Sequence, residues 1–166
     1  MSGDQAAEFR SMFRRHAAGV AIITADVDGE LVGMTVTSLI SVSADPPLIV
    51  FSLSAKSSAT PPLRRATTAV MHLLGAGQLE LARRFATSGI DRFDGVEWTR
   101  LDTGEPVLAD VESWMLCRIV STMPAADSTV VLAQVERVVG AEGIEHHRPL
   151  VYWDRTWHGL GEGSLL

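Results

Sequence analysis

The chain has 166 residues, of which 46% are hydrophobic and 20% are charged, a length and composition that suit one globular domain over residues 1–166. Its net charge is −6 and its arginines form no run longer than a pair, which argues against a nucleic-acid-binding surface. The single cysteine, Cys117, lies in the apolar run "WMLCRIV", so we expect a buried thiol and no disulfide framework. The first residues lack the apolar core of a secretory signal and no apolar stretch reaches membrane-spanning length, so we expect a cytoplasmic protein with no membrane partner.

An amphipathic helix is predicted near the start of the chain. Phe9, Met12, Phe13 and His16 follow the spacing of residues on one helix face, which predicts a helix over about residues 4–17. We expect His16 to pack on this apolar face or to lie at an interface, and not to bind a metal.

A β-hairpin and two further strands are predicted next. The run "VAIITAD" after Gly19 is rich in β-forming residues, and Asp28-Gly29 is typical of a hairpin turn. The next strand is predicted to run through "LVGMTVTSLISV", residues 31–42, and to stop at the prolines of "DPP". The apolar run "LIVFSLS", residues 48–54, has the length of a strand, and we expect it to be buried on both faces.

The rest of the chain predicts more strands than helices. Pro61 and Pro62 suit the start of a short helix. The run "AVMHLL" predicts a strand, and "AGQLELARRFAT" predicts an amphipathic helix. Two long strand-like runs, "VESWMLCRIVST" and "STVVLAQVERVVG", are separated by "MPAAD", and "PLVYWDR" is expected to close the sheet. Seven or so strands with two or three helices predict a mainly β fold, a barrel or sandwich with peripheral helices, and not a Rossmann fold. No histidine, aspartate or glutamate set has metal-ligand spacing, and we expect the pair His146-His147 to be exposed.

One loop carries a pattern typical of phosphate binding. Lys56 is the only lysine of the chain, whose other basic residues are 13 arginines. It lies in "LSAKSSATPP" among four hydroxyl-bearing residues, Ser54, Ser57, Ser58 and Thr60. Hydroxyls, backbone N–H groups, one ammonium and a helix start are the parts of a phosphate cradle. The upstream Gly33 would let a flat ligand approach the backbone closely. The alternative is a solvent-exposed loop in which Lys56 has no special role.

Several motifs together resemble a known family. They are "GVAIITA", "GMTVTSLISVSADPPLIVFSL", "KSSAT", "LARRFA", "DRFDGVEW" and "PLVYWDRTWHGL". Their order over nearly the whole chain resembles that of the flavin reductase-like family of FMN-binding split β-barrels, the small partners of two-component flavin monooxygenases. The resemblance implies an NAD(P)H-dependent flavin reductase with FMN, or alternatively FAD, as its flavin. It also implies a homodimer with the cofactor near the interface, and a partner monooxygenase.

The resemblance implies a set of flavin-binding residues. They are Val36, Thr37 and Ser38 along the isoalloxazine ring, the strand end Ser52-Leu53 beneath it, Lys56, Ser57, Ser58 and Thr60 at the ribityl phosphate, and Phe85 of "ARRFA" at the border of the flavin. Since the hydride passes directly from nicotinamide to flavin, no residue is expected to act as an acid or base.

Two positions depart from the family pattern. The family commonly has Gly-Asp-His-Thr at 126–129, where this chain keeps Asp127 but has Ser128 in place of the histidine, and it usually has an asparagine at His72. By the resemblance, Asp127, Ser128 and His158 of "TWHGL" lie on the nicotinamide side of the flavin. Because Ser128 cannot stack on a nicotinamide, two alternatives stay open: a flavin carrier or sensor without reductase activity, and an FMN-dependent oxidase of the same fold.

Overall fold

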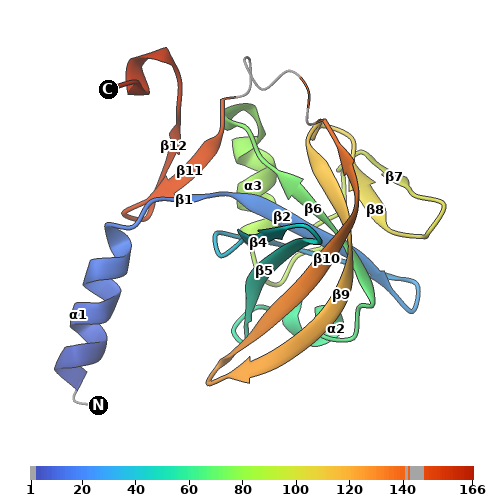
Figure 1. Ribbon diagram of the computed structural model, residues 1–166, viewed down its shortest axis with the longest axis horizontal. Helices are drawn as coiled ribbons and strands as arrows, with labels where there is room; N and C mark the ends of the chain where they lie inside the picture. The colour runs from blue at the N-terminus through green and yellow to red at the C-terminus, as the bar shows by residue number, and fades with distance from the viewer. Residues whose placement is uncertain (1–2, 141, 143–147) are drawn as a thin grey trace.

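The computed structural model describes residues 3–140, 142 and 148–166, and His146-His147 lie outside these residues. The helices and strands are arranged as Figure 1 shows. In chain order they are α1 (Gly3–Arg14), β1 (Ala18–Gly19), β2 (Ala21–Val27), β3 (Glu30–Val36), β4 (Ile40–Ala44), β5 (Pro47–Ser54), α2 (Thr60–Leu63), β6 (Thr68–Leu73), η1 (Ala76–Gln78), α3 (Leu79–Ala86), β7 (Trp98–Arg100), β8 (Pro106–Leu108), β9 (Trp114–Ala125), β10 (Ser128–Val139), β11 (Leu150–Trp153), β12 (Thr156–Gly159) and η3 (Glu162–Ser164).

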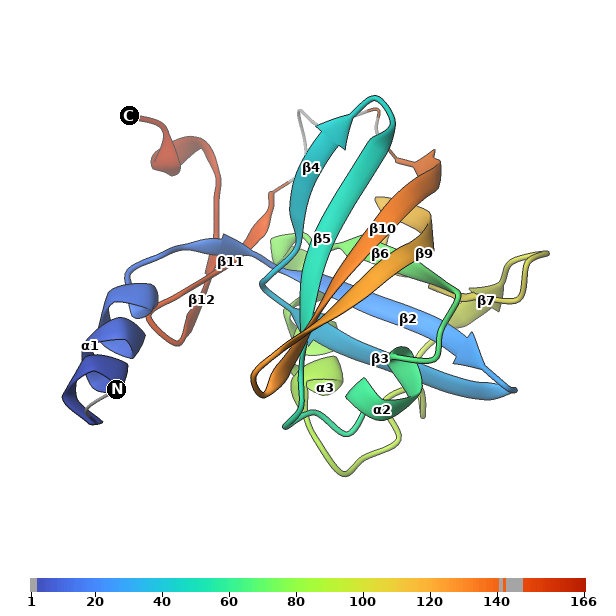
Figure 2. The same cartoon turned by 60° about the horizontal axis from the view of Figure 1, so that its bottom comes forward.

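A curled antiparallel sheet of seven strands forms the body of the protein, in the order β3-β2-β6-β9-β10-β5-β4. The sheet wraps around a core without closing into a full barrel, and the short helix α2 lies at one end of it, beside β3 (Figure 2). This confirms the predicted mainly β, split-barrel fold with peripheral helices.

Strand β2 is buried on both faces and separates two parts of the core. Successive residues of a strand point to opposite faces, and accordingly Ile23 packs inside the curled sheet while Ile22 packs outside it, in the cluster that contains Phe85 of α3. The turn that follows is the predicted hairpin, with positive φ at Asp28 (57°) and Gly29 (86°).

The prediction of one strand over residues 31–42 is wrong. This segment forms β3 and β4, which lie at opposite edges of the seven-stranded sheet. After β3, which pairs with β2, the chain crosses at 37–39 and continues as β4, which pairs with β5. The crossing contains no proline or glycine, and Thr37 and Ser38 suit a strand as well as a connection. The sequence therefore gives no signal that the strand ends here.

The prediction that residues 48–54 are buried on both faces is also wrong. Along β5 buried and half-buried residues alternate, with Ile49, Phe51 and Leu53 facing the core. The reason is that β5 pairs antiparallel with β10 and β4 and has a core on one face only.

The segment "PLVYWDR" does not close the main sheet. Its strand, β11, lies in a separate sheet of three strands in the order β1-β11-β12. Together with α1 this sheet forms a projection from the barrel (Figure 1), which we call the arm. Helix α1 ends at Arg14, and its apolar residues are exposed: Phe9 by 60%, Met12 by 71% and Phe13 by 56%.

The expectation of a buried thiol is met. Cys117 is completely buried, and burial raises the pKa of its thiol to about 12, so it stays protonated. Among the described residues, no helix is long and apolar enough to cross a membrane.

Candidate functional site

The end of β5 is where two of the predicted flavin-binding segments meet. The Ser38 hydroxyl accepts a hydrogen bond from the Ser52 N–H (2.9 Å) and donates one to the Ser52 carbonyl (3.3 Å). These bonds hold the crossing connection after Val36 against a strand that is 14 residues away in sequence. Thr37 is exposed and Leu53 is buried. Thr37, Ser38 and Ser52 therefore lie close together at the surface, while the side chains of Val36 and Leu53 are buried in the core beneath them.

The loop that follows β5 is closed by its own hydrogen bonds. The Ser57 N–H donates to the Ser54 carbonyl (3.0 Å) and the Thr60 N–H to the Ser57 carbonyl (3.1 Å). Thr60 is buried, and its hydroxyl also donates to the Ser54 carbonyl (2.6 Å). Thr60 thus fastens the loop and its proton is not free for a ligand.

The remaining polar groups of this loop suit a phosphate. Lys56 is exposed and forms no ion pair with any residue that the structure describes. Ser58 is exposed, and neither its N–H nor its hydroxyl has a partner within the described ranges. The Ser57 hydroxyl accepts from the Ala59 N–H (3.3 Å) and keeps its own proton for another acceptor. An ammonium, a backbone N–H and two hydroxyls are donors that a phosphate accepts.

The turn between β9 and β10 lies beside the same loop. The Ala55 N–H donates to the Asp127 carbonyl (2.8 Å), and Ser128 pairs with Ser54 in the β10–β5 ladder. Asp127 is exposed and Ser128 is half-buried. Two predicted nicotinamide-side residues are therefore next to the predicted phosphate-binding loop.

Phe85 lies behind the predicted site. It is completely buried in α3 and packs edge-to-face on Phe93, with ring centroids 5.2 Å apart. A Cβ on Gly33 would lie only 2.6 Å from Cε1 of Phe85. The expectation that Gly33 admits a flat ligand is therefore wrong, because its bare backbone receives the Phe85 ring.

His158 is not brought to the other nicotinamide-side residues within one chain. It is exposed on β12, and its ring lies 5.7 Å from that of Trp153. In Figure 1 the arm that carries β12 is well separated from the turn between β9 and β10, where Asp127 and Ser128 lie.

His72 is a structural residue. It is completely buried on β6, and its Nε2 accepts a hydrogen bond from the Leu108 N–H (3.0 Å), so Nδ1 carries the proton toward the Ile22 carbonyl (3.2 Å). Burial lowers the pKa of His72 to about 4, although the bond to Ile22 opposes the shift. The neutral ring thus joins β2, β6 and β8.

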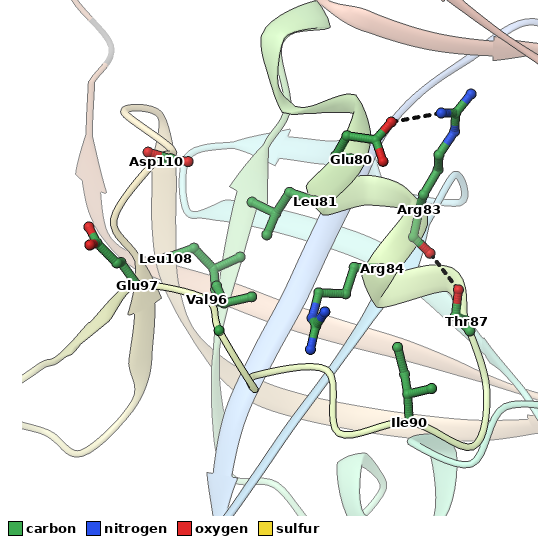
Figure 3. Close-up of a pocket in the computed structure, with 11 residues that line it drawn as sticks. Glu80, Leu81, Arg83, Arg84, Thr87, Ile90, Val96, Glu97, Leu108 and Asp110 are labelled. Atoms are coloured by element: carbon green, nitrogen blue, oxygen red, sulfur yellow. Dashed lines mark hydrogen bonds and ion pairs between the residues drawn. The ribbon is translucent and has the colours of Figure 1, made fainter.

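Two hollows lie near α3. The larger, of about 640 Å³, is lined by α3 and the loop that follows it and contains none of the predicted site residues (Figure 3). Its arginines already have partners: Arg83 pairs with Glu80 at 2.7 Å and Arg84 with Asp94 at 3.8 Å.

The smaller hollow, of about 450 Å³, is lined by Gly33, Ser58 and Arg92 among others and adjoins the loop of Lys56. Sequence reasoning assigned no role to Arg92. Its only signal was the motif "DRFDGVEW", which carries no phosphate-binding pattern of its own.

Residues 13–161 match the model of the flavin reductase like domain. The NADH:FMN oxidoreductase of Rhodococcus qingshengii is 42% identical over 159 residues, which cover 95% of this chain and 83% of that protein. The reductase component of the 4-nitrophenol 4-monooxygenase/4-nitrocatechol 2-monooxygenase of Rhodococcus opacus is 31% identical and covers 89% of this chain and 77% of its own. The crystal structure of a flavin reductase domain protein from Arthrobacter sp. FB24 is 36% identical, with a TM-score of 0.86 and coverage of 94% of this chain and 96% of that chain.

The family match spans most of the chain, and the sequence similarity and the fold agree with it. The protein therefore belongs to the flavin reductase-like family.

Proposed function

We propose that the protein is an NAD(P)H-dependent flavin reductase that reduces FMN for a partner monooxygenase. The observation that carries this proposal is the meeting of residues 36–38, the 52–60 segment and residues 127–128 at one end of β5, in a chain of the flavin reductase-like family. The proposal is supported by relatives named NADH:FMN oxidoreductase and monooxygenase reductase component.

The residues have separate tasks in this proposal. Lys56, Ser57 and Ser58 bind the flavin phosphate, and the connection from Val36 to Ser38 lies along the ring. A bound flavin supplies the acceptor for the nicotinamide hydride. The protein holds the two partners in register and needs no acid or base. Thr60 keeps the loop in shape through its bond to the Ser54 carbonyl.

The protein is further proposed to be a homodimer of single-domain chains and to work in the cytoplasm, where NAD(P)H is available. The exposed apolar residues of α1 and the projecting arm support the dimer, because such a surface is rare on a monomer. A partner's arm would also be a source of His158 for the site.

The test is oxidation of NADH and NADPH with FMN, FAD or riboflavin added. We expect turnover that requires a flavin and is fastest with FMN. Ser128 favours one other function, a flavin carrier. Tight FMN binding without oxidation of either nicotinamide would support the carrier and contradict the reductase.

A further inference from the structure

The smaller hollow, which we call the Arg92 hollow, lies between β3, the start of α2 and the loop before β7. Its lining includes Glu30, Ser58, Pro62, Ile90, Asp91 and Arg92. Its volume of about 450 Å³ is within the range of about 300–1,000 Å³ that is usual for small-molecule sites. Through Ser58 it continues from the loop proposed to hold the flavin phosphate. A group attached to that phosphate would therefore enter this hollow.

Arg92 is a cation held in place by backbone carbonyls, with no counter-ion among the described residues. Its side chain is buried, with Nη1 donating to the Gly33 carbonyl (2.7 Å) and Nε to the Thr87 carbonyl (2.9 Å). It forms no ion pair with any residue of the described ranges. Burial lowers the pKa of Arg92, which reflects the cost of an uncompensated charge.

One nitrogen of Arg92 remains for a ligand. Nη2 has no hydrogen-bond partner in the described part of the chain. In that same part, every side-chain nitrogen that is fully shielded from solvent has a partner, so Nη2 cannot be fully shielded. Nη2 therefore reaches accessible space, and Arg92 lines the hollow. A planar guanidinium held at two other nitrogens is well suited to bind a phosphate.

Two carboxylates at the same hollow suit the sugar of a nucleotide. Glu30 and Asp91 are both exposed there, and Asp91 uses Oδ1 to accept from the Phe93 N–H (2.9 Å). Carboxylate oxygens only accept hydrogen bonds and so suit the hydroxyls of a ribose, while they repel a second phosphate. One cation beside two acceptors fits a nucleoside monophosphate better than a free pyrophosphate.

We propose that the Arg92 hollow binds the adenylate group of a dinucleotide, with Arg92 on its phosphate and Glu30 or Asp91 on its ribose hydroxyls. The inference rests on the proposed function, because it takes the flavin phosphate to lie at Ser58. FAD and NADH both carry an adenylate group, and the experiments below distinguish them.

The first experiment fills the hollow. Ile90 lines both hollows and is 46% exposed, whereas Glu97 lines only the larger one, so Ile90→Trp is the test and Glu97→Trp its matched control. If FAD supplies the adenylate, Ile90→Trp weakens FAD binding by about 10-fold or more, the loss expected for one excluded anionic contact, while FMN binding stays within about 2-fold.

The second experiment examines NADH. If NADH supplies the adenylate, Ile90→Trp raises the KM for NADH but not for reduced nicotinamide mononucleotide, which lacks it, and the ratio of FAD to FMN affinity is unchanged. Glu97→Trp alters none of these values. If Ile90→Trp changes neither the FAD-to-FMN ratio nor the NADH-to-mononucleotide ratio, the proposal is overturned.

A third measurement does not depend on flavin. Binding of 5′-AMP to the wild-type protein is followed calorimetrically. Arg92→Lys keeps the charge but lacks the guanidinium that bonds the Gly33 and Thr87 carbonyls while leaving Nη2 for a ligand, and it is expected to weaken AMP binding by about 10-fold. Absence of AMP binding in the wild type overturns the proposal that the Arg92 hollow binds an adenylate group. AMP binding without FMN binding instead contradicts the proposed function, while the proposal of an adenylate site at the Arg92 hollow stands.

Discussion

Lys56 is the one cation of the hydroxyl-rich loop, and the loop would keep its shape without it. The bonds that close the loop come from Ser57, Thr60 and the backbone. The ammonium is exposed and pairs with no carboxylate of the described residues. Removing it should therefore change ligand binding and leave folding intact.

Lys56→Ala is expected to weaken FMN binding by about 10–100-fold, the usual effect of losing one charge-assisted phosphate contact. Riboflavin has no phosphate and should bind as to the wild type. Arg64→Ala, which removes an exposed cation just beyond α2, is the control and should leave both affinities unchanged. Fluorescence titration with both flavins measures this. Equal losses for FMN and riboflavin would remove Lys56 from the phosphate site.

Ser128 should limit nicotinamide binding. A serine at this position beside the loop cannot stack on a nicotinamide ring, and a lost contact of this kind reduces affinity by about 5–30-fold. We therefore expect Ser128→His to lower the KM for NAD(P)H by a factor in this range without changing FMN binding.

Steady-state kinetics of the wild type, Ser128→His and His158→Ala check this prediction. If Ser128→His leaves KM unchanged while His158→Ala raises it, His158 already supplies the missing contact. Because His158 lies in the arm, away from Ser128 of its own chain, that result would also indicate that it comes from a second subunit.

At the scale of elements, the contact between β3 and α3 sets the position of the strand that leads into the site. Phe85 fills the space over Gly33, and the Thr35 hydroxyl donates to the Ala82 carbonyl (2.7 Å). Arg92 binds the Gly33 carbonyl beside them (2.7 Å). The strand is thus held from its outer side by a helix and a loop.

Gly33→Ala should destabilise the protein by roughly 1–3 kcal/mol, as overpacking of a well-filled core does. The new Cβ would lie 2.6 Å from the Phe85 ring and 3.0 Å from the Ile23 carbonyl, and neither can move freely. Gly77→Ala, where no described residue lies within 4 Å of the added Cβ, is the control. Urea unfolding of both variants measures the difference. Equal midpoints would show that Phe85 repacks without cost.

His72 makes the join between β2, β6 and β8 sensitive to acid. Its folded pKa of about 4 lies below the ordinary 6.5, so the unfolded chain binds the proton more readily. The stability that the neutral ring contributes is complete above about pH 6.5 and is lost as the pH falls toward 4, by roughly 3 kcal/mol in all.

The free energy of unfolding, measured in urea at several pH values, should therefore fall less steeply in His72→Asn than in the wild type below pH 6.5. Asparagine can donate and accept hydrogen bonds as the neutral imidazole does, but it has no proton to bind in this range. His158→Asn, at an exposed histidine, should behave like the wild type. Parallel curves for His72→Asn and wild type would contradict this account.

The sequence predicted most elements but not how they are arranged. Local signals such as Asp28-Gly29 and the apolar run of β5 were sufficient to locate turns and strands. They were not sufficient for the crossing at 37–39, because partner choice is decided by strands far along the chain. They also left β11 in the wrong sheet, since its pairing with β1 depends on residues more than 100 positions earlier.

The sequence predicted the part of the site whose residues are neighbours in the chain. It did not predict the part whose residues come together only in the folded protein. Lys56 with its neighbouring hydroxyls is visible in the sequence as one cluster. Arg92 became visible only once the loop before β7 was folded against Gly33. His72 was noticed as a departure from a family pattern, but only its complete burial explains it.

At the scale of the whole molecule, the arm is the feature that a single chain leaves incomplete. Its helix α1 exposes Phe9, Met12 and Phe13, and the described residues of its own chain do not cover them. The edge strand β4 exposes Ile40 and Val42 as well. Exposed apolar patches of this kind mark contacts with another protein.

Light scattering at micromolar concentration should give a mass about twice that of the 17.9 kDa chain. Met12→Asp should shift the mass toward that of one chain, because it places a charge in the apolar patch. Gln5→Asp, on the same helix at an exposed polar position, should not. A wild-type mass near one chain would contradict the homodimer.

The order of the strands separates the synthesis of the site from its assembly. All residues proposed to bind the flavin ring and phosphate have been translated by residue 60. In the sheet, however, β6, β9 and β10 lie between the β2–β3 hairpin and the β4–β5 hairpin. In a nascent chain the β2–β3 and β4–β5 hairpins are therefore not linked through the sheet until residues 128–139 leave the ribosome. Pairings between such distant residues form slowly. Flavin therefore meets the complete site only after the β9–β10 hairpin has joined both halves of the sheet.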